Sequence, residues 1–464
     1  INIAPQRFTK FKVQGGLQST NHSSLWISSP LLNQKKSFLQ TSIYLDRNPG
    51  VYTYNNPGYG DERRDHNQKH TQRYILSGEH TVNKTKISHH FIFAEEHGET
   101  PGTIPFNPAY QVEFERRAYL LGVDISHPLG SYMDLLYKTS LVGSNNTNVE
   151  GGKKTFFNSY KTSQSATVAV RLTADHEVDV FTDWFYDHVA SDYIGVKKND
   201  NYFEHGIVWK GQFENNQFIL AGVRYLPDQN QYLSNIMLKQ FFRDYFMWAS
   251  YSEGLRLPDY TQLYSQNSYL TGNPNLKPET SSQAEIGAEK PIREHRSTWL
   301  DYLRLKGSLF SIDYRNFINV YQPTPTTYAY RNLDGVTSRG AEALVGFDYE
   351  IYHGSLSYSL LSVKDKTTKR TLELSPTSQI NLLLGAQIFA FIFEVQNSYW
   401  SSYHLGSGHD QKPWLTTDLS LRTNGFQNWK ARLGVQNVFN KQRIFNYGFP
   451  EPGRKYFVFL EREF

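Results

Sequence analysis

The stretch Glu177–His188, which reads EVDVFTDWFYDH, decides the fold. Two kinds of side chain alternate along it at every second position. One set is apolar, aromatic or threonine, and consists of Val178, Val180, Thr182, Trp184 and Tyr186. The other set is acidic or phenylalanine, and consists of Glu177, Asp179, Phe181, Asp183, Phe185 and Asp187. Successive side chains of a strand point to opposite faces, so this pattern predicts a β-strand with one apolar and one charged face.

The same alternation recurs along the chain, and no stretch of comparable length has helical periodicity. It is found at Thr167–Ala174, Leu303–Ser308, Ser355–Leu360, Leu415–Arg422 and Trp429–Gln436. The sequence therefore predicts an all-β protein. Two architectures place an apolar and a polar face on every strand. One is a sandwich with a buried core, and the other is a barrel with lipid outside and water inside.

The connections between these segments favour the barrel, because they alternate in length. Brief polar turns occur at Thr81–Lys84, Glu214–Asn216, Glu350–His353 and Asn424–Asn428, among others. Long polar stretches lie between them, including Arg47–Lys69, Gly143–Tyr160, Glu253–Pro278, Asn319–Thr337 and Trp400–Trp414. Short turns at one end and long loops at the other are typical of outer-membrane barrels. Counting along this pattern predicts an antiparallel transmembrane β-barrel of about 22 strands, with both termini on the short-turn side.

Composition supports this class and excludes several others. The chain has 464 residues, of which 15% are aromatic, and a mean hydropathy of −0.57. It has no cysteine, which excludes disulfides and thiolate metal sites, and its 48 basic and 44 acidic residues are too balanced for a nucleic-acid binder. No apolar run approaches the roughly 18 residues that a spanning helix needs. Aromatic residues that bracket the strands are expected in girdles at the membrane interfaces, or alternatively in a sandwich core. They are Tyr44, Trp184, Tyr186, Trp209, Trp248, Trp299, Trp400, Trp414 and Trp429.

Several motifs resemble those of the TonB-dependent outer-membrane receptors. Ala249–Pro258 with Gln262–Tyr264 and Gly272–Glu279 is similar to the mid-barrel signature of that family. Ser338–Glu342, Val435–Asn440 and the Pro-Gly-Arg at Pro452–Arg454 resemble its later segments in the same order, and the chain ends on a phenylalanine. We interpret the signature residues as structural: Arg256, Pro258, Asn273, Pro274, Asn275, Leu276, Pro278, Glu279, Gly453, Arg454 and Phe464.

The resemblance implies energy-coupled uptake of a scarce nutrient chelate across the outer membrane of a Gram-negative bacterium. The cargo would be a ferric siderophore, cobalamin, haem or another metal complex. The implied partners are outer-membrane lipid and lipopolysaccharide, the ligand, a plug domain, and the TonB complex acting through that plug; no nucleic acid is implied. Ile1-Asn-Ile3 resembles the close of the family's plug. Residues 1–6 are therefore expected to be a remnant of the plug–barrel junction, with the plug missing from this chain and residues 7–464 forming the barrel.

Two other functional classes are considered beside the receptor. The first is a passive porin-like channel of the outer membrane, which needs no plug and against which the motifs at 249–279 argue. The second is a soluble all-β carbohydrate-binding protein. Enzymes are not expected, because the chain has no GxSxG, Walker, HExxH or EF-hand motif.

Two loops carry the residue types that suit capture of a chelate or haem. Tyrosine offers stacking area with a phenol, and histidine is a ligand for iron, copper and zinc. The expected ligand-binding residues are Tyr52, Tyr54, Tyr59, His66, His70, Tyr403, His404 and His409. Scattered surface histidines are the alternative interpretation.

A hard cation is a further possibility in the first of these loops. Asp61, Glu62 and Asp65 offer oxygen ligands for Ca²⁺, while Arg63 and Arg64 could neutralise the same carboxylates in a mixed-charge loop. Apart from such a bound Ca²⁺ or a transported metal chelate, no cofactor is expected in the barrel.

Overall fold

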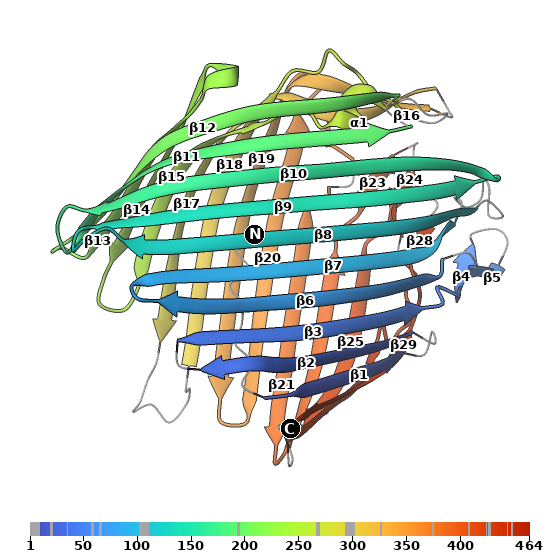
Figure 1. Cartoon of the computed structure of the whole chain (residues 1–464). Coiled ribbons are helices and arrows are strands. Elements are labelled where there is room, and N and C mark those ends of the chain that lie inside the picture. The colour runs from blue at the N-terminus through green and yellow to red at the C-terminus, as the bar shows by residue number, and fades with distance from the viewer. Residues whose placement is uncertain are drawn as a thin grey trace.

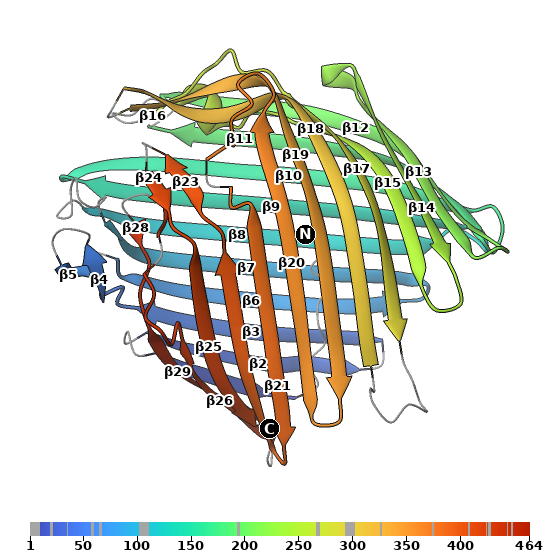
Figure 2. The same cartoon turned by 180° about the vertical axis from the view of Figure 1, so that it is seen from behind.

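A computed structural model of the chain describes residues 10–18, 22–34, 36–56, 60–64, 67–101, 111–192, 195–265, 270–292, 302–324, 327–373, 375–406, 409–423, 425, 428–442, 444–446 and 449–464. Most of them lie in one antiparallel sheet whose 22 consecutive wall strands close into a barrel (Figures 1 and 2). The predicted fold class and strand number are confirmed. The first nine residues, and with them the expected junction at residues 1–6, lie outside the described residues.

The wall strands follow the order of the chain. They are β1 (Lys12–Gln18), β2 (Ser23–Gln34), β3 (Ser37–Asn48), β6 (Lys69–Val82), β7 (Thr85–Pro101), β8 (Gln111–Pro128), β9 (Met133–Glu150), β10 (Lys153–Arg171), β11 (His176–Ser191), β12 (Val196–Phe213), β13 (Gln217–Leu226), β14 (Gln231–Phe241), β15 (Phe246–Arg256), β17 (Glu279–Ile292), β18 (Tyr302–Thr324), β19 (Thr327–Tyr349), β20 (Tyr352–Asp365), β21 (Ser378–Ile388), β22 (Phe391–Trp400), β25 (Trp414–Thr423), β26 (Trp429–Gln436) and β29 (Lys455–Glu463).

The remaining elements lie in the connections at the long-loop end. They are the hairpins β4 (Tyr52–Asn56) with β5 (Gly60–Arg64), β23 (Tyr403–Gly406) with β24 (His409–Gln411), and β27 (Ile444–Asn446) with β28 (Phe449–Pro450). The loop between β15 and β17 holds α1 (Tyr260–Tyr264) and β16 (Leu270–Thr271), and the 3₁₀ turn η1 (Pro227–Gln229) joins β13 to β14. Among the described helices, none has the length and apolar character needed to cross a membrane.

The barrel closes where its first strand meets its last. β1 pairs with β29 antiparallel, in a register that runs from Lys12 opposite Glu463 to Gln18 opposite Phe457. Each described wall strand thus has a partner on both sides, so the sheet presents no unpaired edge there. The strands of the near and far walls cross steeply in both views, as the tilted strands of a closed barrel do (Figures 1 and 2).

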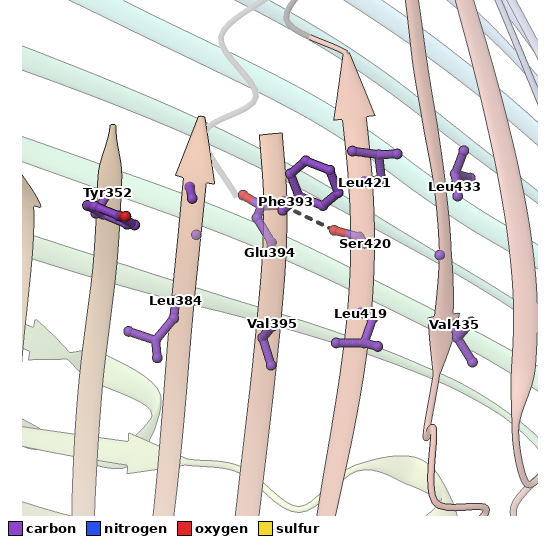
Figure 3. A pocket seen from close by; sticks show the side chains of 13 residues that line it. Tyr352, Leu384, Phe393, Glu394, Val395, Leu419, Ser420, Leu421, Leu433 and Val435 are labelled. Atoms are coloured by element: carbon purple, nitrogen blue, oxygen red, sulfur yellow. Dashed lines mark hydrogen bonds between the residues drawn. The ribbon is translucent and has the colours of Figure 1, made fainter. Parts of the chain in front are cut away.

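Alternation separates an apolar outer face from a polar bore. Leu356, Leu309 and Leu419 project outward and are 43%, 60% and 40% exposed. Figure 3 shows Leu384, Val395, Leu419 and Val435 side by side along a shallow outer groove of about 450 Å³. Ion pairs between neighbouring strands line the bore, among them Lys12–Glu461, Arg422–Glu394, Arg304–Glu289, Lys210–Asp179 and Lys69–Glu96. Such a wall suits lipid outside and water inside.

One predicted long loop is largely strand. Within the stretch Gly143–Tyr160, β9 continues to Glu150 and β10 begins at Lys153, so only Gly151 and Gly152 form the turn. Their φ angles of 54° and 78° lie in the left-handed region that glycine adopts without strain. The two glycines are therefore a tight hairpin turn, and the polar residues around them form a β-ribbon at the long-loop end. Asn319–Thr337 is likewise mostly strand, in β18 and β19.

The predicted aromatic girdle is only partly correct. Trp184 and Tyr186 lie on the same face of β11 as Val180, which is 50% exposed on the outside. Tyr44 and Trp248 instead lie on the bore face. The Tyr44 hydroxyl donates to Asp46 at 2.9 Å, and the Trp248 indole N–H donates to Glu285 at 3.2 Å. An aromatic side chain with a polar atom can be held inside a wide polar barrel, so aromatic type alone does not assign a face.

Candidate functional site

A group of polar and aromatic side chains, here called the mouth cluster, lies on the bore face at the long-loop end. It consists of Lys161 on β10, Asp187 on β11, Asp200 and Tyr202 on β12, and Tyr260 on α1. The Lys161 ammonium donates to the Tyr202 hydroxyl at 2.7 Å and lies 3.5 Å from the Asp187 carboxylate. The cluster therefore offers a cation, two carboxylates and two phenols on one surface.

Aromatic stacking holds the strand part of this cluster in place. The rings of Phe185 and Tyr202 are 4.7 Å apart and inclined by 16°. The ammonium of Lys161 lies 5.2 Å from both ring centroids. Offset stacking with a cation nearby is a favourable arrangement of such side chains. The same arrangement could receive a planar aromatic or catecholate ligand.

Helix α1 is anchored to the wall from the β15–β17 loop. The Asp259 carboxylate caps the helix by accepting from the Gln262 backbone N–H at 2.8 Å. The Tyr260 hydroxyl donates to Asp200 on β12 at 2.8 Å. Lys198, also on β12, lies 4.8 Å from the centroid of the Tyr264 ring. The loop thus reaches past the short β13–β14 hairpin, as the position of α1 beside β11 and β12 in Figure 1 illustrates.

Tyr260→Phe should release α1 from β12 without changing the wall. Burial and the hydrogen bond to Asp200 raise the pKa of Tyr260, so its neutral form is favoured in the folded state. The contact is fully present below the unfolded pKa of about 10 and is lost as the pH rises through the higher folded pKa. We expect faster amide hydrogen exchange in α1 at neutral pH and an unchanged thermal unfolding of the barrel. Amide hydrogen exchange in α1 that is the same in the variant and the wild type would show that the Tyr260–Asp200 hydrogen bond does not anchor the helix.

The signature residues of the sequence hold this loop to the neighbouring strands. The Arg256 guanidinium donates to Glu279 at 3.0 Å, and Glu279 also accepts from the backbone N–H of Ile318 at 3.0 Å. Asn273 donates to the carbonyl of Tyr330 at 3.1 Å, and Leu276 is buried. The remaining residues of the segment, Pro258, Pro274, Asn275 and Pro278, lie in the loop outside the ladder, where proline loses no hydrogen bond.

The other signature residues lie near the end of the chain. The Arg454 backbone N–H donates to the Asn440 side chain at 2.8 Å. A Cβ added to Gly453 would lie 2.1 Å from the same Asn440 oxygen, so any other residue there would displace the Asn440 side chain from its hydrogen bond with Arg454. The backbone N–H of Phe464 donates to the carbonyl of Phe11 at 2.9 Å, which joins the last residue to the segment before β1.

Glu279→Ala should loosen the β15–β17 loop. The carboxylate is buried, and its removal leaves the buried N–H of Ile318 without its acceptor, at a cost of about 1–3 kcal/mol. Arg256 is 46% exposed and so adds little. We expect a lower unfolding temperature and faster hydrogen exchange between β15 and β17. Glu285→Ala, on the same strand but bonded to a side chain, is the matched control and should have a smaller effect.

Of the expected ligand-binding residues, the structure describes some and not others. Tyr52 and Tyr54 lie on β4, and Asp61 and Glu62 lie on β5 of the same hairpin, where Tyr54 is paired with Glu62, Tyr52 with Arg64 and Asp61 with Asn55. Tyr59, Asp65 and His66 lie outside the described residues. The hairpin places these residues at the long-loop end, with one tyrosine directly opposite one acidic residue in the strand register.

The histidine candidates are separated. His70 is exposed near the start of β6, opposite His97 of β7. His404 lies on β23 and pairs with Asp410 of β24 at 2.5 Å, with His409 on the same hairpin. Tyr403 is buried, with 7% of its surface exposed, so it is less accessible than its neighbour His404.

One group of potential metal ligands could not be recognised in the sequence, because its members come together only through strand pairing. Glu95, His97 and Glu115 each place one ligand atom within 4.8 Å of the others on the outer face of β7 and β8. The Arg117 guanidinium already occupies the space between the carboxylates, at 2.8 Å from Glu95 and 2.7 Å from Glu115. A cation would have to displace it, so this group is better described as a saturated ion-pair network.

Known proteins share this architecture. A family model described as "TonB dependent receptor-like, beta-barrel" matches residues 13–438. Among solved structures, the copper transporter OprC aligns with a TM-score of 0.81 at 11% identity, over 99% of this chain and 82% of that chain. The ferric-catecholate import receptor Fiu from K12 E. coli aligns with 0.78 at 12% identity, over 99% and 82%. The hemophore receptor HasR of Serratia marcescens aligns with 0.75 at 13% identity, over 99% and 81%. At these identities the structural likeness concerns the fold.

Proposed function

Because the chain belongs to the TonB-dependent receptor family, whose β-barrels are transporters of the outer membrane, we propose that it imports a scarce nutrient as a chelate by energy-coupled transport. The cargo class is a ferric siderophore, cobalamin, haem or another metal complex. This proposal is supported above all by the polar, ion-paired bore of a 22-stranded barrel, which is too wide for wall side chains to fill.

In this proposal the barrel supplies the wall and the outer binding surface. Residues 7–464 form the barrel, and residues 1–6 join it to a plug domain that lies within the bore of the intact protein. The TonB complex would act on that plug and deliver the energy for uptake. The ion pairs of the bore, such as Arg304–Glu289 and Arg422–Glu394, would then face the plug as well as the cargo.

The outer end of the barrel carries the groups for recognising the cargo. The mouth cluster combines stacked aromatic rings with a lysine and carboxylates, and this suits a chelate that has both a flat aromatic part and charged oxygens. The tyrosines of β4 and the histidines of the β23–β24 hairpin would add contacts from the loops. Asp61 and Glu62 could hold a Ca²⁺ ion that stiffens β5.

Growth under nutrient depletion tests the proposal. A Gram-negative strain lacking its own receptors would express the full-length protein and be supplied in turn with iron chelates, cobalamin, haem, copper or zinc. We expect one class to restore growth, and we expect the rescue to disappear when TonB is deleted. Rescue that persists without TonB would instead indicate a passive porin-like channel.

Tyr202→Ala should weaken uptake of the cargo that restores growth. Removing the ring eliminates the stack with Phe185 and the acceptor of Lys161, and one aromatic contact is typically worth about 1 kcal/mol, or about fivefold in affinity. Phe203→Ala is the matched control, since Phe203 is the next residue and lies on the outer face with 44% exposure. An equal loss of uptake in both variants would show that the mouth cluster is not part of the surface that recognises the cargo.

A further inference from the structure

The outer half of β12 has a strand neighbour on one side only. β11 pairs with residues 196–211 of β12, whereas β13 pairs only with residues 205–213. In the part of the chain that the structure describes, no strand therefore lies beside residues 196–204 on the β13 side. This segment of β12 is here called the open edge.

The open edge lies outside the membrane because the β13–β14 hairpin is short. β13 has 10 residues and β14 has 11, which is about the length that a tilted strand needs to cross the hydrocarbon. Tyr225 and Tyr232 stack at the outer end of this hairpin, with ring centroids 4.6 Å apart, and Tyr232 is 65% exposed. β12 has 18 residues and begins beyond this level, beside α1 (Figure 1). The backbone of the open edge is thus in water, where a soluble partner can reach it.

Alternate residues of the open edge direct their backbone hydrogen-bonding groups away from β11. In an antiparallel ladder the N–H and C=O of one residue point to one neighbouring strand, and those of the next residue point to the other. The Gln212 N–H donates at 2.9 Å to the carbonyl of Asp175, which precedes β11, so even-numbered residues of β12 face β11. The Phe203 N–H points the other way and donates to the Asp228 carboxylate of η1 at 3.3 Å. The residues of the open edge that share the direction of Phe203 are Lys197, Asn199 and Asn201.

These three backbone positions are available for an added strand. Among the described residues, none accepts a hydrogen bond from their N–H groups. The nearby α1 contacts β12 only through bore-facing side chains, since Tyr260 bonds to Asp200 and the Tyr264 ring lies against Lys198. At Phe203 the Asp228 carboxylate already takes the place of a strand carbonyl. The three positions beyond it therefore offer donors and acceptors in the spacing that an antiparallel strand requires.

Two lysines lie at the outer end of the open edge. Lys197 is exposed on the outer face, and Lys198 lies on the bore face. Within the described ranges, the ion pairs of β12 involve Glu204 and Lys210 and neither of these lysines. An added antiparallel strand would run opposite to β12, so its carboxyl end would lie beside Lys197 and Lys198. Charge complementarity at this end therefore favours a strand that ends in carboxylates.

We propose that the open edge binds the extended, acidic carboxyl-terminal segment of an extracellular protein, which adds to the barrel wall as an antiparallel strand. The backbone of this segment would exchange hydrogen bonds with Lys197, Asn199 and Asn201, and its carboxylates would lie beside the two lysines. Pairing of this kind draws its affinity from the main chain and its selectivity from the flanking side chains. The proposal goes beyond import and does not depend on which nutrient the protein transports.

Binding of a labelled peptide to the full-length protein in detergent, followed by fluorescence anisotropy, tests the proposal. The probe alternates valine and threonine and ends in two glutamates with a free carboxyl terminus. Asn201→Pro removes one donor of the open edge and leaves the β11 ladder intact, because this N–H points away from β11. We expect it to weaken binding about fivefold or more, the equivalent of one backbone hydrogen bond. Asn201→Ala keeps the N–H and is the matched control, which should bind like the wild type. Heat-modifiable migration on gels checks that each variant is folded.

Modified peptides test the same pairing on the wild type alone, which stays decisive if Asn201→Pro fails to fold. One peptide carries N-methyl groups on its odd-numbered residues and another on its even-numbered residues. Only one of these two sets can face β12, so we expect one methylated peptide to lose binding and the other to keep it. A peptide that ends in two glutamines and a carboxamide should bind more weakly than the acidic probe.

Three outcomes would overturn the proposal. The first is equal affinity of Asn201→Pro and Asn201→Ala for the acidic probe. The second is equal affinity of the wild type for the two methylated peptides, which would show that charge alone holds the probe without strand pairing. The third is equal affinity for the acidic probe and the glutamine peptide, which would refute an acidic segment as the partner.

Discussion

Leu356→Arg will destabilise the barrel in a lipid bilayer by about 2–4 kcal/mol, the cost of a basic side chain facing lipid near the midplane. Leu356 lies on β20 between Tyr352 at the short-turn end and the interface near Ser362, and 43% of its surface is exposed on the outer face. Arginine at this depth cannot reach either headgroup layer without distorting the membrane. The free energy of unfolding in vesicles, measured by denaturant titration, is the quantity that changes.

Ser357→Arg is the control for that substitution. Ser357 is the next residue along β20 and faces the bore, where the Asn381 side-chain amide donates to its hydroxyl at 3.5 Å. An arginine there meets water and polar side chains, so we expect the free energy of unfolding to change by less than about 1 kcal/mol. A cost as large as that of Leu356→Arg would mean that both faces of β20 are buried in a core. The barrel would then be refuted in favour of a sandwich.

The second large effect concerns conductance. The 464-residue chain inserted alone into a planar bilayer should conduct ions as a wide open pore, because the wall side chains of a barrel of about 22 strands cannot fill its lumen. Single-channel conductance should fall as small polyethylene glycols enter the pore, and larger polymers should leave it unchanged. The polymer size at this transition reports the width of the bore.

In the function proposed above the intact protein carries a plug in its bore, and a protein that includes this plug is the control for the conductance experiment. We expect its single-channel conductance to be several-fold smaller under the same conditions. A small, closed-like conductance from the 464-residue chain alone would contradict the open bore. It would require that segments of this chain fill the lumen themselves.

Much of the fold could be predicted from the sequence because strand alternation is a local property. The pattern at Glu177–His188 already separates the two faces of β11, and the structure gives the same assignment. The turn at Gly151 and Gly152 could also be predicted, because two adjacent glycines between alternating segments indicate a hairpin. The polar residues around these glycines predict a long loop and not two strands, because a β-ribbon beyond the membrane is as polar as a loop.

The site was less predictable, because its geometry depends on residues far apart in the chain. Tyr260 and Asp200 are 60 positions apart and meet only because α1 passes the short β13–β14 hairpin. Glu95 and Glu115 likewise meet only through the register of β7 with β8. Tyr44 and Trp248 were assigned to the wrong face for a related reason. An aromatic residue fits either side of this wall, and its hydrogen-bonding partner decides which.

The most direct measurement of the central claim is a cysteine scan along β20. The chain contains no cysteine, so each introduced thiol is the only one to react. In outer membranes that contain the 464-residue chain alone, a water-soluble maleimide should label single cysteines at Ser355, Ser357 and Ser359, which face the aqueous bore. It should leave those at Leu356, Tyr358 and Leu360 unlabelled within the lipid. Labelling that does not alternate along the strand would contradict a closed barrel with water inside and lipid outside.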